Sequence, residues 1–517
     1  MGREFEFPLL HGTSGLSEEA VARGVEELTN RRVLHSVGER LDFTHDRVRE
    51  VAYGQILAPR RKVLHRRVAE ALETLYAANL EPHHLALGLH YFEGEVWERA
   101  VVHLRLAGTR AFERSANLDA VACLERALQA LGHLPESPFT LEQAFEIRLD
   151  LRPVLGQLGE AQATLERLRE AEAVAERLAD DHRRGRVCAH LTNTCSLLGE
   201  LDNALATGAR ALEIAGRIGD LRLRIVTTSH LAQAHYYRGD YERVLELALD
   251  NLAASPADWV YENLGTSTPA SVRDRHWLIM TLAQLGRFGE AAEHEAEAIR
   301  LAEPTRHAMT IGLPLIASGT LGLIKGNWAK AHRLLEHGIA VLRTGNVALL
   351  LPIAVISFGW VLAELGEGGD ALERLREGQQ LLDRLGSSAI LGWTCHALGS
   401  AYMQLGRLDE AQRFGKRVMD SAPSQFGYAA HAFHLLGDIR PIPTGSMPTA
   451  ARPTTARRWL SPSRAGCGRS SHIAVSGSAS SIDVWTGTSR RTNTSPQPRS
   501  CTTTWGCRSG WDRRRRS

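Results

Sequence analysis

Cysteine side chains are the first candidates for chemistry in this sequence, because thiolates bind metals and act as nucleophiles or redox groups. Seven cysteines occur among 517 residues, and none forms the CxxC pair of zinc sites and redox motifs. Six residues separate Cys188 from Cys195, while Cys123 and Cys395 stand alone. We therefore predict that these cysteines are small apolar side chains of the core.

Histidine and acidic residues are the next candidates. His83, His84 and His90 could bring ring nitrogens together, but no cysteine or carboxylate stands at ligand spacing beside them, so no metal site is predicted. Asp and Glu mostly stand three or four residues from an Arg, which is typical of solvent-exposed helix faces rather than of paired catalytic acids. No G-x-S-x-G motif is present. The sequence predicts neither catalytic residues nor a cofactor.

Phosphate binding is also not predicted, since the sequence lacks the GxxxxGK[ST] loop whose amides and lysine hold nucleotide phosphates. The chain by itself should neither bind ATP tightly nor hydrolyse it. The formal net charge of +2 divides unevenly: residues 440–517 hold 14 Arg, two Asp and no Lys or Glu, or +12, which leaves −10 for residues 1–439. A mildly acidic helical part does not suit nucleic acid, which requires clustered Lys and Arg.

Membrane insertion is not predicted either. No apolar run is judged to approach the roughly 18 residues of a membrane span. The N-terminus MGREFEFPLLHG lacks a basic region followed by an apolar core, as a secretion signal would have. We predict a cytoplasmic protein without a membrane partner.

The elements that must position any site are predicted from a recurring turn, in which an apolar helix ends at a Gly and an Ala-rich helix follows. Gly allows the positive φ at which the chain turns, and Ala at contact positions such as Ala291 and Ala331 lets the paired helices approach closely. No such pair buries its apolar stripe alone, so stacking completes the core. Six turn glycines are spaced 40, 47, 40, 40 and 40 residues apart: Gly199, Gly239, Gly286, Gly326, Gly366 and Gly406.

This period predicts an all-α solenoid over residues 60–439, a right-handed superhelix of repeats of about 40 residues with no sheet. Its concave face is the predicted contact for a protein, peptide or small effector. An insertion over residues 252–273, rich in Pro, Ser and Thr, accounts for the 47-residue step. Trp259 and Tyr261 there are candidate partner-binding residues. The alternative is that both rings pack the insertion onto the repeats.

The segment LAQAHYYRGDYERVLELAL, residues 231–249, resembles a tetratricopeptide repeat with a long period. HEAT and armadillo repeats share the 40-residue scale, but their Pro and Asp/Arg signatures are missing. Residues 1–59 read as a helix over 17–29, two short extended segments and a helix from Asp46. This order resembles the winged-helix element that closes signal-transduction ATPases, and FTHDRVREVAYGQILAPRRKVLHRRVAEALE resembles the junction of ATPase and repeats in adenylate cyclase-like members.

The resemblance implies a non-catalytic sensor arm of a cyclase-like signalling ATPase. The alternative is a fragment of an ATP-dependent signalling enzyme, or of a transcriptional regulator of the maltose-activator kind, whose P-loop lies upstream. In related ATPases a winged-helix histidine contacts the nucleotide phosphate, which makes His45 the one nucleotide-sensing candidate; a structural role is the alternative.

Residues 440–517 lose the helical pattern after FHLLGDI and contain 25 Ser or Thr beside their arginines. Reading a neighbouring frame of the back-translated segment restores amphipathic helices and a Gly turn. We therefore expect an out-of-frame, disordered tail, and a basic arm is the alternative.

Overall fold

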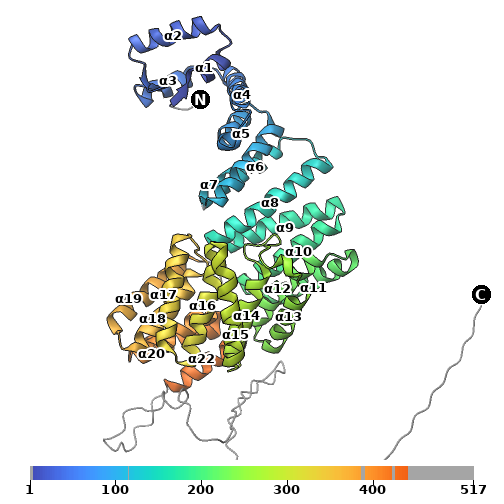
Figure 1. Cartoon of the computed structure of the whole chain (residues 1–517), viewed down its shortest axis with the longest axis vertical. Helices are drawn as coiled ribbons and strands as arrows, with labels where there is room; N and C mark the ends of the chain where they lie inside the picture. The colour runs from blue at the N-terminus through green and yellow to red at the C-terminus, as the bar shows by residue number, and fades with distance from the viewer. Residues whose placement is uncertain (1–3, 115, 386–389, 422–425, 440–517) are drawn as a thin grey trace, which may run out of the picture. The chain divides into compact units, whose positions relative to one another are not determined.

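The structure is a computed structural model that describes residues 4–114, 116–385, 390–421 and 426–439. The tail predicted to be out of frame, residues 440–517, lies outside the described residues. Helices dominate the described part, as predicted, and the only strands within it lie before residue 44. The all-α, tetratricopeptide-like repeat class predicted from the turns is therefore confirmed (Figure 1).

The N-terminal part combines a small sheet with three helices. Ser17 caps the predicted first helix by accepting a hydrogen bond from the amide of Ala20. The sheet has the order β1-β3-β2 with antiparallel pairing, and Phe5 and Leu41 lie in its small core. The first strand was not predicted, because three residues carry too little alternation to be recognised. The elements are β1 Glu4–Glu6, α1 Phe7–Ser14, α2 Glu18–Asn30, β2 Leu34–Val37, β3 Arg40–Phe43 and α3 Asp46–Gln55.

Antiparallel helices then follow one another to the end of the described chain (Figure 1). They are α4 Ala58–Leu75, α5 His84–Glu93, α6 Trp97–Glu113, α7 Asn117–Leu131, α8 Pro138–Leu158, α9 Ala161–Leu178, α10 Asp181–Leu198, α11 Leu201–Ile218, α12 Leu221–Arg238, α13 Tyr241–Ala254, α14 Ala270–Gln284, α15 Phe288–Ala302, α16 Ala308–Lys325, α17 Trp328–Thr344, α18 Leu351–Leu365, α19 Gly368–Arg384, α20 Leu391–Gln404, α21 Leu408–Ser421 and α22 Phe426–Asp438. Short 3-10 turns occur at Glu81–His83, Ala257–Trp259 and Glu303–Thr305.

Each turn glycine named from the sequence ends the first helix of a pair in a left-handed conformation, with φ between 72° and 93°. A side chain there would be strained, which is why Gly recurs at this point. Ala204, Ala291, Ala331, Ala371 and Ala411 each stand five residues after one of these glycines, in the second helix, and all are fully buried. Gly turn and Ala contact together set how closely the two helices of a pair approach.

The repeats form an inner and an outer layer of helices. The inner helices α10, α12, α14, α16, α18, α20 and α22 contact one another in succession. Burial follows this division: α12 buries 13 of its 18 residues, whereas the outer helix α11 buries six of 18. The inner helices therefore hold the side chains from which an interior site must be built.

Helix α16 departs from the prediction that no segment could cross a membrane. Its 18 residues have a mean hydropathy of 1.4, sufficient by length and composition, and no other described helix reaches both criteria. However, 67% of this window is buried inside the protein, where α16 packs against α14, α17 and α18. A core helix of a large repeat protein becomes this apolar because it is covered on all sides.

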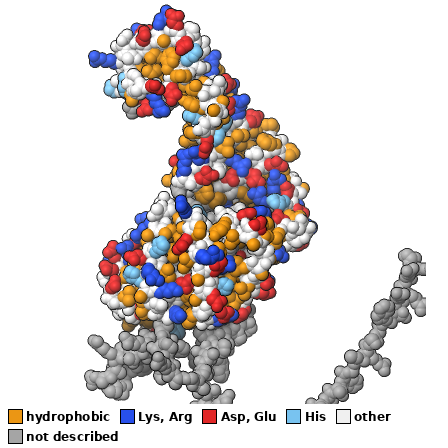
Figure 2. Space-filling view, viewed as in Figure 1, with side chains coloured by type: hydrophobic (Ala, Val, Ile, Leu, Met, Phe, Trp, Pro, Cys, Tyr) orange, Lys and Arg blue, Asp and Glu red, His pale blue; other side chains and the backbone are white. Residues whose placement is uncertain are grey.

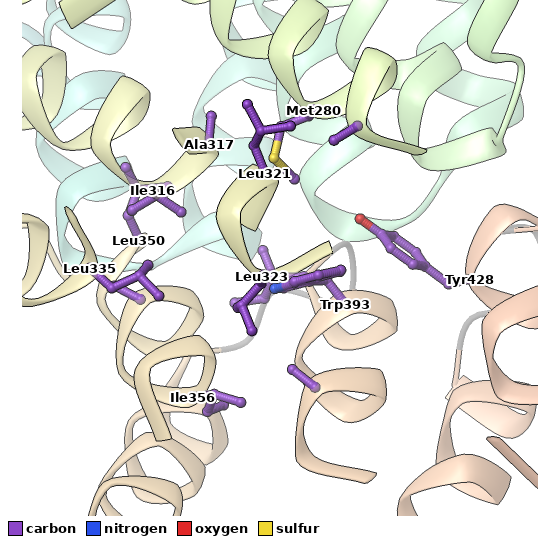
Figure 3. Close-up of a cluster of buried hydrophobic side chains, with 14 of the residues drawn as sticks. Met280, Ile316, Ala317, Leu321, Leu323, Leu335, Leu350, Ile356, Trp393 and Tyr428 are labelled. Atoms are coloured by element: carbon purple, nitrogen blue, oxygen red, sulfur yellow. The ribbon is translucent and has the colours of Figure 1, made fainter. Parts of the chain in front are cut away.

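The last described helix closes back onto an earlier repeat. In α22, the hydroxyl of Tyr428 lies 3.4 Å from that of Tyr236 in α12, 192 residues earlier. The closing contact brings together inner helices that are far apart in the sequence. Figure 3 shows Tyr428 and Trp393 in the buried apolar cluster with Met280 and Leu350.

The interruption of the repeats is shorter than the predicted 252–273. Helix α13 continues to Ala254 and α14 begins at Ala270, so only residues 255–269 lie between them. Pro256 and Pro269 mark the two ends of this segment, since proline lacks the amide that an interior helical position needs. We call residues 255–269 the interrupting loop.

Candidate binding cavity

A cavity lies among the inner helices, with walls from α8 to α22 and from the interrupting loop. We call it the interior cavity. Its volume is about 170 Å³, close to the roughly 150 Å³ of an apolar cavity that accepts benzene. It therefore accommodates a group of about the size of one aromatic ring, such as a small molecule or one side chain of a larger partner.

One part of the interior cavity is apolar and aromatic. The ring centroids of Tyr236 and Trp277 are 5.1 Å apart, and those of Tyr236 and Tyr428 are 6.4 Å apart with an edge-on geometry. Trp393 also lines this part, and its indole nitrogen donates to the Ser357 hydroxyl at 3.1 Å. Buried aromatic rings of fixed orientation provide a contact surface at low entropic cost (Figure 3).

An adjacent part is polar and carries positive charge. Arg152 of α8 and Arg273 of α14 both line it, together with His230 and Gln233 of α12. Gln233 accepts a hydrogen bond from the amide of Asn193 at 2.7 Å. Arg273 is 8% exposed. Two guanidinium groups on the wall of a largely apolar cavity are costly to desolvate, and their presence calls for an explanation.

The interrupting loop holds both arginines in place. Arg152 donates from Nη2 to the carbonyl of Gly265 at 2.9 Å. Arg273 donates from Nη1 to the Thr266 hydroxyl at 2.9 Å and to the Thr268 carbonyl at 3.3 Å. The loop therefore lines the cavity with Thr266, Ser267 and Thr268, and it holds Arg152 through the carbonyl of Gly265.

The arginines and the histidines of the cavity differ in charge at neutral pH. Burial, followed by repulsion from Arg273, lowers the pKa of Arg152 to about 10, so the side chain stays charged at neutral pH. Burial lowers the pKa of His276 to about 4 and that of His230 well below its usual range. Both imidazoles are thus neutral, and each has Nδ1 within hydrogen-bond distance of a backbone carbonyl, that of Leu313 for His276.

A buried carboxyl group completes this part of the molecule. Asp274 is fully buried beside Arg273, and one of its oxygens accepts from the amide of Asn251 at 2.7 Å. The other oxygen accepts from the Ser229 hydroxyl. Burial raises the pKa of Asp274 to about 6, so it is mostly ionised at neutral pH. Its oxygens are bonded to Asn251 and Ser229, and it forms no ion pair with Arg273 among the described residues.

The candidate residues named from the sequence lie outside the interior cavity. Trp259 lies under the guanidinium of Arg222, whose central carbon is 4.3 Å from the ring centroid, and Tyr261 is 50% exposed. His45 is an exposed residue at the N-terminus of α3. The turn glycines lie at helix ends. Sequence reasoning identified the interrupting loop but missed the residues through which it reaches the cavity.

The cysteines and histidines considered for metal chemistry do not gather. Cys188, Cys195 and Cys395 are buried, and burial raises the pKa of each thiol to about 11, which leaves them protonated. His84 and His90 each pair with a different histidine, the partner of His84 being His103. Within the described ranges, no group of three or more His, Cys, Asp or Glu is arranged to hold a metal ion.

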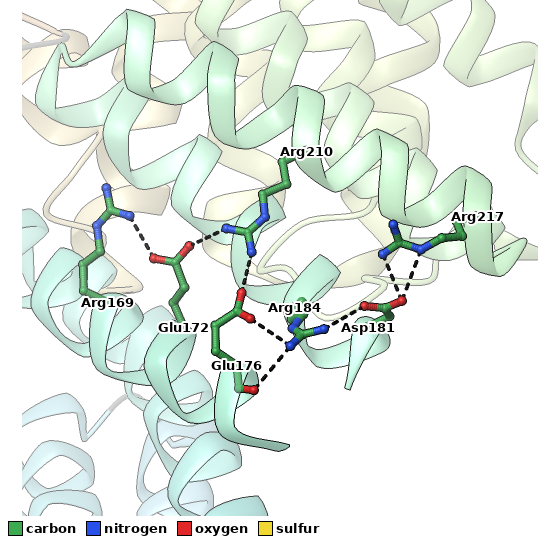
Figure 4. A network of polar contacts seen from close by, with 7 residues as sticks. All are labelled: Arg169, Glu172, Glu176, Asp181, Arg184, Arg210 and Arg217. Carbon is green, nitrogen blue, oxygen red and sulfur yellow. Dashed lines mark hydrogen bonds and ion pairs between the residues drawn. The ribbon is translucent and has the colours of Figure 1, made fainter. Parts of the chain in front are cut away.

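A second group of charges lies on the outer surface, across α9, α10 and α11 (Figure 4). Arg210 bridges Glu172 and Glu176, Arg184 bridges Glu176 and Asp181, and the series continues to neighbouring arginines. Every charge in this group has an opposite partner. We call it the surface network, and its members are Arg169, Glu172, Glu176, Asp181, Arg184, Arg210 and Arg217.

Fold and cavity together define a helical-repeat protein of the tetratricopeptide type with an interior cavity. Residues 394–425, which span α20, α21 and the Gly406 turn, match the family described as tetratricopeptide repeat. No curated protein matches the sequence significantly.

Several solved structures are similar at low identity. One is a Rap protein complexed with Competence and Sporulation Factor, with 13% identity over 66% of this chain and 99% of that chain, at a TM-score of 0.44. Another is a signal transduction ATPase with a tetratricopeptide repeat sensor from Pyrococcus horikoshii, with 15% identity over 85% of this chain and 58% of that chain, at 0.39. The quorum sensor NprR from B. thuringiensis gives 14% identity over 78% and 99%, at 0.42. Similarity at this level carries no conclusion about what this chain binds.

Proposed function

We propose that this chain is a non-catalytic regulatory module that binds an effector in the interior cavity. The observation that carries the proposal is the ring-sized cavity whose lining combines aromatic rings with fixed polar groups. Sites for small ligands commonly combine apolar walls with a few oriented polar groups. The effector is a small molecule, or one end of a peptide or protein whose remainder lies on the concave face.

The wider role is proposed from the sequence resemblance. Residues 60–439 act as the sensor arm of a cyclase-like signal-transduction ATPase in the cytoplasm, and residues 1–59 are the winged-helix-like element that joins the arm to the ATPase. ATP then acts only through a separate domain, and His45 is the residue of this chain that could contact its phosphate. Trp259 and Tyr261 form a second, exposed contact for a partner.

A matched pair of glycine variants tests the cavity. Gly156 lines the interior cavity, and a Cβ placed there meets no atom within 4 Å. The same is true of Gly216, which is exposed on the outer helix α11. Gly156→Leu therefore adds a side chain to the cavity wall from a Cβ position that is free of contacts, while Gly216→Leu makes the same chemical change outside the cavity.

The measurement is tryptophan fluorescence of the full chain, whose ten tryptophans include Trp277 and Trp393 on the cavity wall, during titration with phenylacetamide, a neutral probe of ring size. We expect saturable binding to the wild type and to Gly216→Leu, and loss of binding in Gly156→Leu. Equal binding by all three proteins would contradict the proposal.

A further inference from the structure

We propose that Arg152 and Arg273 form a subsite for a monocarboxylate, so that the effector of the interior cavity carries one carboxylate attached to an apolar group. The inference rests on the proposed function and adds the charge and chemical class of the ligand. It follows from what these two guanidinium groups lack among the residues around them.

Neither arginine forms an ion pair with a carboxylate in the part of the chain that the structure describes. Two of the three guanidinium nitrogens of Arg273, Nε and Nη2, are buried and have no protein hydrogen-bond partner, and the same holds for Nε of Arg152. Arg183 and Arg184 also have an unbonded Nε, but their terminal nitrogens bind acidic side chains. Arg49 and Arg275 also have an unbonded Nε and no ion pair among the described residues, but neither lines the interior cavity. The two cavity arginines therefore combine the lack of a carboxylate partner with a place on the cavity wall.

The charge count near the subsite identifies the ligand as a monoanion. Arg152 and Arg273 contribute two positive charges, and the buried Asp274 contributes one negative charge. Arg186, the other cation that lowers the pKa of Arg152, is paired with Glu146 through two contacts of 2.8 and 3.1 Å. The nearby His230 is neutral. Arg275 also acts on Asp274, but it donates to the Ser271 carbonyl and does not line the cavity. For the arginines on the cavity wall one uncompensated positive charge remains, and a single carboxylate neutralises it.

A water molecule would compensate the charge of these guanidinium groups less well than a carboxylate. A water molecule can accept from an N–H group, but it leaves the net charge in a medium of low dielectric constant, where an isolated charge is costly. A carboxylate accepts two parallel hydrogen bonds from a guanidinium fork and supplies the opposite charge as well. The adjacent wall of Tyr236, Trp277 and Trp393 then receives the apolar group that bears the carboxylate.

Two sources can supply this chemistry: a free carboxylic acid or the C-terminus of a peptide that ends in an apolar residue. Four probes separate them. Phenylacetate is compared with phenylacetamide, and N-acetyl-Gly-Phe with a free carboxylate is compared with its C-terminal amide. Each pair differs in charge and keeps the ring, and the source is assigned to whichever acid binds more tightly.

The experiment is calorimetric titration of the full chain with the four probes. We expect at least one acid to bind about tenfold or more tightly than its amide, as charge-assisted hydrogen bonds imply. This advantage should disappear in Arg152→Gln and in Arg273→Gln and persist in Arg210→Gln, which alters an arginine of the surface network. Arg273→Lys, which keeps the charge but loses the fork, should retain part of the advantage.

Thermal unfolding without ligand tests the alternative that the two arginines serve the stability of the fold and not ligand binding. Arg152→Met removes a half-buried cation that has no ion-pair partner among the described residues, so its unfolding temperature should equal or exceed that of the wild type. If Arg273→Gln does not fold because its contacts with Thr266 and Thr268 are lost, Arg152→Gln decides the matter.

Equal affinity of acids and amides for the wild type would overturn the subsite and leave the proposed function standing. An acid advantage that survives in Arg152→Gln would also overturn it, as would a lower unfolding temperature of Arg152→Met. If none of the probes binds the wild type, the proposed function itself fails.

Discussion

The surface network and the pair of cavity arginines differ in how their guanidinium charges are compensated. In the surface network each guanidinium is paired with a carboxylate, as Arg210 is with Glu172 at 3.2 Å (Figure 4). Its members are partly or fully exposed to solvent. Arg152 and Arg273 bind loop carbonyls and a hydroxyl, without a carboxylate partner among the described residues. Paired surface charges add little to stability, whereas an unpaired buried charge costs stability unless a ligand compensates it.

The visible surface fits the first of these patterns. Figure 2 shows acidic and basic side chains interspersed over the face in view rather than gathered into one patch. Such a surface attracts no strongly charged partner. For charged ligands, the comparison therefore directs attention from the face in view towards the interior cavity.

The largest effect is expected from Asp274→Ala. This change leaves Arg273 without its nearest negative charge and leaves the donors Asn251 and Ser229 without their acceptor, at a cost of about 3–5 kcal/mol in the free energy of unfolding. Asp181→Ala, in the surface network, is the matched control and should change stability little. Urea unfolding of both variants measures the difference. Similar losses in the two variants would remove the distinction between the regions.

A smaller effect is expected from pH. Burial holds the pKa of His276 at about 4, against about 6.5 in the unfolded chain, so the unfolded state takes up a proton first as the pH falls. Stability is therefore lost from about pH 6.5 downwards, by about 2 kcal/mol at pH 5 from this residue. His230 and His190 act in the same direction.

Asp274 opposes this trend. Because its pKa is raised to about 6 in the folded protein, its unfavourable contribution diminishes as the pH falls from about 6 to about 4. Urea unfolding at pH 7.5 and pH 5.0 tests the histidine part: wild type should lose more stability than His276→Gln, whose amide can still donate to the Leu313 carbonyl. An equal loss in the two proteins would show that His276 does not contribute.

The smallest effect is expected within the surface network. A double-mutant cycle of Arg210→Ala and Glu172→Ala should give a coupling energy of about 0.2–1 kcal/mol at low salt. It should approach zero in 1 M NaCl, where charges are screened beyond about 3 Å. A coupling of several kcal/mol that persists in salt would place the network in the same energetic class as the cavity.

Local sequence signals predicted the fold because each repeat contains its own turn and helix-contact residues. A Gly at positive φ recurs in all six units from Gly199 to Gly406, and an Ala stands five residues later in five of them, Val244 being the exception. Neither signal depends on distant residues. The surface network was partly foreseeable for the same reason: Arg184 and Asp181 stand three residues apart on one helix.

The cavity could not be predicted in this way. Its walls join α8 to α14 and α12 to α22, and no local period shows that these helices meet. One signal was present in the sequence: neither Arg152 nor Arg273 has an Asp or Glu three or four residues away, unlike many arginines of this chain. That signal marks a residue without a local partner, but only the fold shows that the two lie on one cavity.

The contact between Tyr428 and Tyr236 has a consequence for how the protein folds. In an open array of repeats each unit depends only on its neighbours, so folding can begin anywhere and spread. Here a segment of 192 residues must be closed for α22 to reach α12, and closure entropy grows with the logarithm of loop length. The final repeat therefore docks late, after the intervening units have formed and shortened the effective loop. Contacts this remote in sequence raise the contact order and slow the last step of folding.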